Sequence, residues 1–391
     1  MNRYRWVILG LAVFAQMAFS AVIQGLPAMG PALRDAFDLS LPQVGLVLSA
    51  LTAGGAISLV PWGLITDKFG SQRTLLVGLG GYGAALALAA LADQVIVLSL
   101  FLVLAGMLGG VTSVAGGRTV LMWFSASSRG TALGLRQTAV PIGSAIGALT
   151  LPAIAAASGV DGGLVVLAVS CGLAALTCGL WIRGRNAGEQ EETGGRIPMK
   201  DPRMWRLAAA TCLLAFTQLS IVTFAVLFLN EERGFTPQGA GVVLAAIQLL
   251  GAGARVGLGW WSDRIASRII PLQRVALCIS ISWFISAAVF EIEGWIFITL
   301  LIAAGMLSVS WNALSFTAAA EYAGHGRAGT AIGMQQTLVF GAAAIVAPAF
   351  GSLVEAIDWR PAFVALGISP LGAWIVLRTL PDPLSRSESK A

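Results

Sequence analysis

The sequence has very little charge for its length. Only 11% of its 391 residues are Asp, Glu, Lys or Arg, whereas 57% are hydrophobic and the mean hydropathy is +0.83. Soluble domains usually carry about 25% charged residues. A soluble fold of this length could not hide so much apolar surface, so the scarcity of charge excludes that class and favours a chain whose solvent is lipid.

Residues that carry enzymatic or metal chemistry are also scarce. Histidine occurs once, at His325, and the cysteines at 171, 178, 212 and 278 fall in apolar segments without metal-ligand spacing. We find no nucleophile–base pair, no metal cluster and no phosphate-binding loop in the sequence. We therefore expect no enzyme, no metal and no cofactor, and we interpret the cysteines as small core residues.

Apolar stretches about 20 residues long, the length that a helix needs to cross a bilayer, recur along the chain. They predict an all-α membrane protein with twelve transmembrane helices. The predicted spans cover residues 6–30, 42–66, 73–92, 95–124, 130–157, 163–183, 205–229, 240–262, 275–292, 295–320, 328–355 and 361–380. The first run is too long for the apolar part of a signal peptide and is interpreted as a span.

Lys and Arg concentrate in every second connection between these spans, which is the positive-inside pattern of membrane proteins. An even number of spans places both termini on the same side as those connections. We therefore expect a multi-pass protein of a bacterial cytoplasmic (inner) membrane with both termini in the cytoplasm. The net charge of +5 then reflects this topology and indicates no nucleic-acid partner. The opposite connections carry only Arg34, Arg233 and Arg360.

The longest polar stretch runs from Arg183 to Arg206, and its Gly, Glu and Arg content is typical of a solvated linker. It divides the spans six and six. We therefore predict an N-terminal six-helix bundle over residues 1–183, a cytoplasmic linker over 184–204 and a C-terminal six-helix bundle over 205–391.

The two halves repeat one another at offsets near 200 residues. One short match could arise by chance, but four matches in the same order indicate a duplication, and such repeats are typical of transporters. The matches are Gly130–Thr138 with Gly329–Thr337, Gly106–Leu108 with Gly305–Leu307, Phe14–Gln16 with Phe216–Gln218, and Asp67 with Asp263. Arg136 replaces Gln335 of its repeat partner, so one half has gained a charge at a polar position.

The connection after the second span reads GLITDKFGSQR. It resembles the loop motif of the major facilitator superfamily, which has glycine, aspartate, a basic residue, glycine and a second basic residue at these spacings. A helix-end aspartate can accept hydrogen bonds from a neighbouring helix, and glycine allows a tight turn. The resemblance implies two pseudo-symmetric six-helix bundles and a conformational latch. The latch residues are Gly63, Asp67, Lys68, Gly70 and Arg73.

A second copy of this motif, from Gly259 to Arg268, carries Asp263 and Arg264. The resemblance adds these two residues to the latch. Ala266 stands where the family often has glycine, so we expect the second latch to be looser.

Charged residues inside spans are costly and usually functional. Arg118, Arg136 and Arg255 fall in the fourth, fifth and eighth spans, each six to eight residues from the cytoplasmic end. At 1.5 Å per residue, this is a depth of about 9–12 Å. No Asp or Glu lies comparably deep in the sequence. A buried guanidinium is best matched by a bidentate anion such as a carboxylate, so the substrate is the expected partner.

The run from Arg255 to Asp263 is similar to one in organic-anion members of the superfamily, such as the oxalate/formate and monocarboxylate groups. In those members the arginine of the eighth span binds the substrate carboxylate, and the resemblance implies this role for Arg255. The run Arg136–Pro141 resembles the cyanate-porter-like branch. Arg118 matches a structural arginine of the family, so structural and substrate-binding roles both stay open for it.

Uncharged polar residues in cavity-lining spans are expected to complete the substrate site. Deep amides can donate hydrogen bonds to an anion, although hydrogen bonding between helices is an equal alternative. The candidates are Gln16, Gln137, Gln218, Trp311, Asn312, Gln335 and Gln336.

These features predict a monomeric secondary active transporter whose two bundles rock about a central site and open it to one side at a time. Its expected cargo is a small organic or inorganic anion, with a carboxylate as the first candidate. Transport would be driven by a co-transported proton or by an exchanged anion. Two alternatives stay open. One is a multidrug exporter of neutral or lipophilic compounds, which would tolerate loss of the deep arginines. The other is a membrane sensor that binds without transport.

Overall fold

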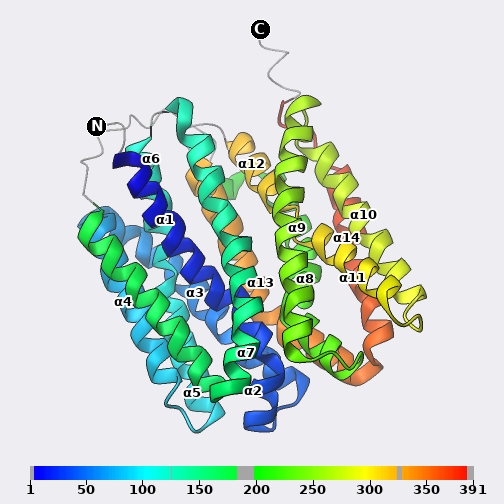
Figure 1. Ribbon diagram of the computed structural model, residues 1–391. Coiled ribbons are helices and arrows are strands. Elements are labelled where there is room, and N and C mark those ends of the chain that lie inside the picture. Colours follow the sequence, from blue (N-terminus) through cyan, green and yellow to red (C-terminus); the bar gives the residue numbers. More distant parts are fainter. Residues whose placement is uncertain (1–3, 125, 183–197, 324–327, 385–391) are drawn as a thin grey trace. The chain divides into compact units, whose positions relative to one another are not determined.

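The structure, a computed structural model, describes residues 4–124, 126–182, 198–323 and 328–384. These residues are almost all helical and include no strand (Figure 1). Ten of their helical segments are long and apolar enough to cross a membrane. One of the ten, Leu135–Trp181, is interrupted at Ser158 and Gly159, at the boundary between the predicted fifth and sixth spans. The prediction of an all-α membrane protein is therefore confirmed.

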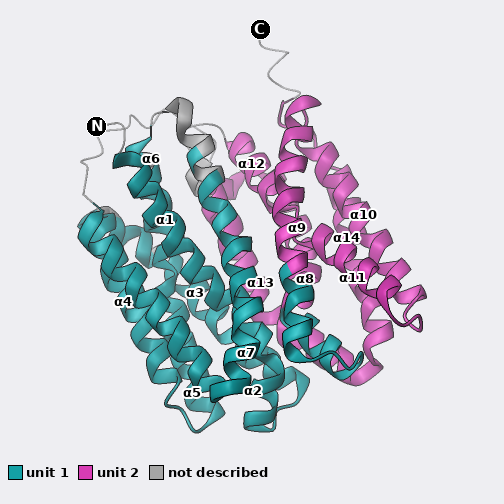
Figure 2. Cartoon of the chain, viewed as in Figure 1, with its two compact units in different colours: residues 1–190, 223–245 teal, residues 191–222, 246–391 magenta. Residues whose placement is uncertain are grey.

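The chain divides into two compact units (Figure 2). Unit 1 comprises residues 1–190 and 223–245, and unit 2 comprises residues 191–222 and 246–391. The division runs through α8 (Pro202–Glu231) and α9 (Pro237–Arg264). The end of α8 and the start of α9 therefore belong with the first spans. The domain boundaries expected from the sequence stay a prediction, and most of the expected linker over 184–204 lies outside the described residues.

Unit 1 contains the first six spans. Its elements are α1 (Tyr4–Ser20), η1 (Ala21–Gly25), η2 (Leu26–Met29), α2 (Gly30–Phe37), α3 (Leu41–Phe69), α4 (Ser71–Ala89), α5 (Val95–Gly109), α6 (Val111–Trp123) and α7 (Ala126–Trp181). The long helix α7 packs against α1 and α4, and α3 packs against α5. Within α7, Gly159 has a φ of +72°, a conformation that glycine adopts without steric cost, and this turn separates two spans.

Unit 2 contains the remaining helices. After η3 (Pro198–Lys200) and its parts of α8 and α9, these are α10 (Ile269–Ala288), α11 (Trp295–Ser308), α12 (Asn312–Ala323), α13 (Ala328–Ile357) and α14 (Trp359–Arg378). Helix α10 packs against α11 and α14, and α12 packs against α13.

Glycines bring α1 and α7 unusually close together. A Cβ atom placed on Gly143 of α7 would lie 2.9 Å from Cα of Met17. One turn further along α7, Gly147 approaches η1 just as closely, because a Cβ on Gly25 of η1 would lie 2.9 Å from Cα of Gly147. Small residues allow helices in lipid to approach closely, where dispersion and polar contacts hold them together. Helix α1 is thus fixed against α7 beside the buried polar residues described below.

The fourth span of each half is broken at the same place. A turn at Gly110 separates α5 from α6, and a turn at Val309 and Ser310 separates α11 from α12. Gly110 and Val309 are 199 residues apart, which is the offset of the repeat. In both units an arginine side chain donates to a backbone carbonyl group beside this break.

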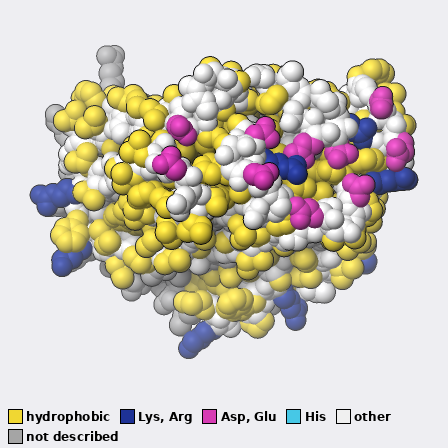
Figure 3. Space-filling view, turned by 90° about the horizontal axis from the view of Figure 1, so that it is seen from below, with side chains coloured by type: hydrophobic (Ala, Val, Ile, Leu, Met, Phe, Trp, Pro, Cys, Tyr) yellow, Lys and Arg dark blue, Asp and Glu magenta, His cyan; other side chains and the backbone are white. Residues whose placement is uncertain are grey.

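Large apolar side chains are exposed along the helices of both units. Soluble proteins rarely leave so much apolar surface in contact with water, so lipid is the natural solvent for these faces. Figure 3 shows hydrophobic side chains over much of the visible face, with acidic side chains among them. The most exposed large apolar residues include Leu64, Leu91, Ile96, Leu180, Trp295 and Ile345.

Candidate functional site

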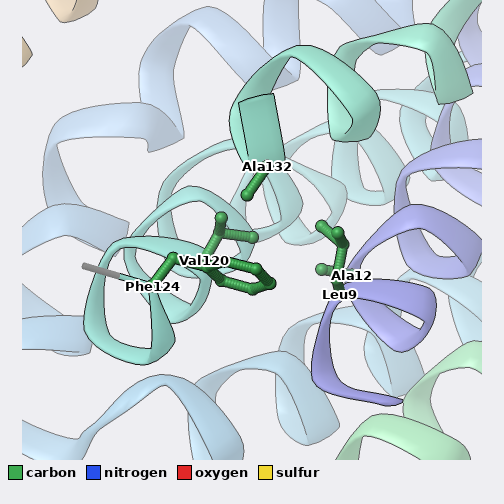
Figure 4. Close-up of a cluster of buried hydrophobic side chains, with 5 residues drawn as sticks. All are labelled: Leu9, Ala12, Val120, Phe124 and Ala132. Carbon is green, nitrogen blue, oxygen red and sulfur yellow. The ribbon is translucent and has the colours of Figure 1, made fainter. Parts of the chain in front are cut away.

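A hydrophobic cluster joins three helices of unit 1 (Figure 4). A polar site lies next to it along the same three helices. The cluster consists of Leu9 and Ala12 from α1, Val120 and Phe124 at the end of α6, and Ala132 from α7. Residues four apart share one face of a helix. The same faces therefore continue to Gln16 on α1, Gly116 on α6 and Arg136 on α7.

Arg136 is held within this polar site, with only 5% of its surface exposed. Its Nη2 donates to Gln16 Oε1 at 2.5 Å and to the backbone carbonyl oxygen of Thr112 at 2.7 Å. Gln16 is also buried, and its Nε2 donates to Ser20 Oγ at 3.4 Å. Helices α1, α6 and α7 thus each contribute to the site, and one nitrogen of the guanidinium makes both contacts.

The charge of Arg136 has no acidic partner among the described residues. Its buried Nε also lacks a hydrogen-bond acceptor there. A buried donor left unmatched costs about 1–3 kcal/mol, and taking an ion out of water costs several more. An anion whose oxygen reached Nε would offset both costs.

Arg255 lies on α9 in unit 2 and is half-buried. Its Nε donates to the backbone carbonyl oxygen of Val309 at 2.8 Å, just after the end of α11. Positive charge is favoured at a helix C-terminus, so this contact has a structural effect. Its two Nη groups donate to no described residue, and within that part of the chain it forms no ion pair.

Two clusters of uncharged polar residues lie in unit 2. In one, Asn312 Nδ2 donates to Gln218 Oε1 at 3.3 Å. In the other, Ser315 Oγ donates to Gln335 Oε1 at 2.7 Å and lies 3.0 Å from Thr211 Oγ1. Hydrogen bonding between helices, which the sequence left as an alternative, is thus present. Asn312 Oδ1 and Gln335 Nε2 are nevertheless buried without partners among the described residues, and both can bind a ligand group.

The other candidate residues have different surroundings. Gln137 is exposed, Gln336 and Arg118 are half-buried, and Trp311 is fully buried with no partner for its Nε1 in the described part of the chain. Arg118 lies on α6 and Arg136 on α7, and both belong to unit 1. Because the candidates are divided between two units, a common site for all of them stays a prediction.

The first latch motif joins α3 to α4. Gly70 has a φ of +80° and stands between the two helices, as the tight turn requires. Lys68 and Arg73 are exposed, and Gly63 lies within α3. The side chain of Asp67 lies outside the described residues. The conformational role of this motif stays a prediction.

The second latch motif uses a basic residue that the sequence interpretation missed. Asp263 forms an ion pair with Arg268, whose Nε also lies 3.0 Å from Glu321 Oε1. Arg264 is instead exposed, with its guanidinium 5.4 Å from the centre of the Trp260 ring. Burial lowers the pKa of Arg268, but hydrogen bonds to Asp263 and Glu321 outweigh burial and hold that pKa above its ordinary value. In the first copy the last basic residue, Arg73, lies three residues after Gly70, whereas Arg268 lies two residues after Ala266. This near match to the last basic position of the motif was the available signal.

Asp382, after α14, is a second residue that the sequence interpretation missed. Its Oδ2 accepts hydrogen bonds from Ser267 Oγ, from the backbone N–H of Arg268 at 2.9 Å and from that of Ile269 at 3.1 Å. These groups surround the N-terminus of α10, where backbone donors have no partner within the helix. No sequence pattern links Asp382 to a turn more than a hundred residues earlier.

The sequence is similar to those of known proteins. The sequence profile of the Major Facilitator Superfamily matches residues 8–348. An MFS-type transporter of Mycobacterium tuberculosis, Rv2994, is 34% identical over 388 residues, which cover 97% of this chain and 86% of the relative. The probable sulfoacetate transporter SauU of Cupriavidus necator is 28% identical over 382 residues, covering 90% of this chain and 87% of the relative.

The fold has counterparts among solved structures. The crystal structure of a D-xylose–proton symporter matches with a TM-score of 0.78 and 15% sequence identity, over 97% of this chain and 99% of that one. At this identity, the likeness concerns the fold alone.

Proposed function

Because the chain belongs to the major facilitator superfamily and is a transporter rather than an enzyme, we propose that it moves a small anion by alternating access. A carboxylate is the best candidate, and Arg136 is its main ligand. We further propose a monomer in the bacterial cytoplasmic membrane with both termini in the cytoplasm. Transport is coupled to a proton or to an exchanged anion.

The observation that carries this proposal is the unmatched buried charge of Arg136. Its Nε has no acceptor among the described residues, and its Nη2 is held by the neutral groups of Gln16 and Thr112. Arginine presents planar, fork-shaped donors that suit carboxylates. Neutral cargo would leave this charge uncompensated, which disfavours the exporter of lipophilic compounds.

One of the relatives supports an anionic cargo. SauU, which covers most of this chain, is named for sulfoacetate, a small molecule that is anionic at both ends. Arg255 is the second proposed ligand. The sequence resemblance implies this role, and its two Nη groups donate to no described residue and can bind an anion. Both arginines are therefore included in the test.

The test is an uptake screen in proteoliposomes over monocarboxylates, dicarboxylates, sulfoacetate, cyanate and nitrate. We expect Arg136→Gln to lower anion uptake at least about tenfold, since a hydrogen bond to a charged group contributes about 1.5–3 kcal/mol. Arg274→Gln is the matched control, because Arg274 is exposed on α10. Full anion uptake by both Arg136→Gln and Arg255→Gln would contradict the proposal. Binding without uptake would instead favour the sensor.

A further inference from the structure

The guanidinium of Arg136 lies against a position where the chain has no side chain. Gly116 faces it from α6, one turn after Thr112. A Cβ atom placed on Gly116 would lie 2.9 Å from Arg136 Nη2 and 3.3 Å from Nε. Non-bonded heavy atoms are most stable about 3.5–4.0 Å apart. Any side chain at Gly116 would therefore displace the guanidinium.

Unit 2 has a different pair at the same two positions of the repeat. Ser315 and Gln335 each lie 199 residues after Gly116 and Arg136, respectively. Ser315 Oγ donates to Gln335 Oε1 at 2.7 Å. The shorter, neutral glutamine is thus paired with a residue that reaches it, whereas the longer arginine is paired with a residue that leaves room.

We propose that Gly116 is a positioning residue of the anion site, matched to Arg136 as Ser315 is matched to Gln335. The expected effect of Gly116 on anion binding rests on the proposed function. The pairing itself rests only on the geometry within each unit.

A side chain at Gly116 would force either the helices or the Arg136 guanidinium to move, and the guanidinium moves more easily. The atoms that a new Cβ would meet are at the free end of the arginine side chain, so the helices can stay in place. The guanidinium shifts instead, away from the carbonyl of Thr112 and from Gln16. A serine would in addition offer its hydroxyl oxygen to Nε, the donor proposed for the anion. The protein should therefore stay folded while the anion site weakens.

The first experiment measures acetate binding to the detergent-purified protein by calorimetric titration. Gly116→Ala and Gly116→Ser should each weaken acetate binding about tenfold with little change in Tm. Gly117→Ala is the matched control, because a Cβ on this neighbouring glycine of α6 meets nothing within 4 Å. Its acetate affinity should stay within about twofold of wild type. Equal affinities for Gly116→Ala and Gly117→Ala would overturn the positioning role.

The second experiment is a double-mutant cycle on Tm with Gly116→Ser and Arg136→Gln, which needs no ligand. Together these substitutions reproduce the Ser315–Gln335 pair in unit 1. We expect Gly116→Ser to raise Tm more, or lower it less, in the Arg136→Gln background than in the wild type. Additive effects would overturn the pairing. If the wild type binds no anion but the cycle shows coupling, the proposed function fails while the pairing stands.

Discussion

At the scale of single residues, Arg136 and Arg255 illustrate two uses of an arginine inside a span. Arg136 is almost fully buried, and its contacts are to neutral groups and leave Nε unmatched. Arg255 is half-buried and caps the end of α11 through Val309. A helix-capping role accounts for part of the cost of placing Arg255 in a span. Arg136 also donates to a backbone carbonyl, that of Thr112, but Thr112 lies at the start of α6, where no helix C-terminus favours a positive charge. The burial of Arg136 therefore carries the functional argument.

Ala266 provides a prediction at the same scale. It adopts a φ of +49° in the turn after α9, where glycine has no steric cost. The left-handed conformation costs a residue with a Cβ about 1–2 kcal/mol, which Ala266→Gly would remove. Glycine has more conformational freedom in the unfolded chain, and this offsets about 0.4–1 kcal/mol of that stabilisation. We expect Ala266→Gly to raise the free energy of unfolding by roughly 0.5 kcal/mol, seen as a higher Tm.

The matched control for Ala266 is Ala254, within α9. Gly in a helix interior is about 1 kcal/mol less favourable than Ala, so Ala254→Gly should lower Tm. If Ala266→Gly were as destabilising as Ala254→Gly, the turn would not be strained.

At the scale of elements, the N-terminus of α10 is capped by a residue from the end of the chain. Asp382 accepts hydrogen bonds from two backbone N–H groups there and from Ser267. Arg268 in the same turn joins α9 to α12 through Asp263 and Glu321. Its raised pKa means that its contribution to stability is lost only when the pH rises through a strongly alkaline folded-state pKa. The segment after α14 thus caps α10 and holds the turn from which Arg268 reaches α9 and α12.

Removing this cap should have a measurable cost. Loss of a helix N-cap costs about 0.5–2 kcal/mol, so we expect Asp382→Ala to lower Tm. Asp382→Asn keeps an acceptor oxygen without the charge and should fall between Asp382→Ala and the wild type. A Tm for Asp382→Ala equal to that of the wild type would show that the cap contributes nothing.

Most elements could be predicted from the sequence, because a bilayer requires apolar helices of nearly constant length. The breaks in the fourth spans could not, since Gly110 and Val309 lie within continuous apolar runs. Arg136 and Gln16 were predicted as site residues, because charge and amides at depth stand out. Gly116 was not predicted, because a glycine has no chemistry of its own and its role depends on how close α6 and α7 lie.

At the scale of the whole molecule, the division into units does not coincide with the sequence repeat. Residues 223–245 pack with the first spans: a Cβ on Gly30 would lie 3.0 Å from Leu227 Cδ1, and Arg34 forms an ion pair with Glu231. Both ionic side chains are about a third exposed, so their pair contributes only about 0–1 kcal/mol. Close helix packing must therefore provide most of the stability of this region.

Gly241 tests whether this packing matters for transport. A side chain there would overlap the backbone carbonyl oxygen of Ala148, which cannot move aside as a side chain can. We expect Gly241→Val to separate residues 223–245 from the first spans and to lower uptake. In a chain without native cysteines, a thiol introduced at the buried Leu227 should then react faster with N-ethylmaleimide.

Gly253→Val is the control for this prediction. Gly253 lies on the same helix, and a Cβ on it meets nothing within 4 Å. The thiol at position 227 should therefore react with N-ethylmaleimide as fast in Gly253→Val as in the chain that keeps both glycines. Equal rates in the Gly241→Val and Gly253→Val backgrounds would mean that this packing is not held by the close approach at Gly241.

On the proposed function, the ligand supplies the negative charge that Arg136 lacks. The most direct test compares acetate with acetamide, which has nearly the same shape but no charge, by thermal shift of the purified protein. We predict that acetate raises the Tm of the wild type and acetamide does not, and that Arg136→Gln removes this difference. Equal shifts for the two compounds in the wild type, or an unchanged preference for acetate in Arg136→Gln, would contradict the claim.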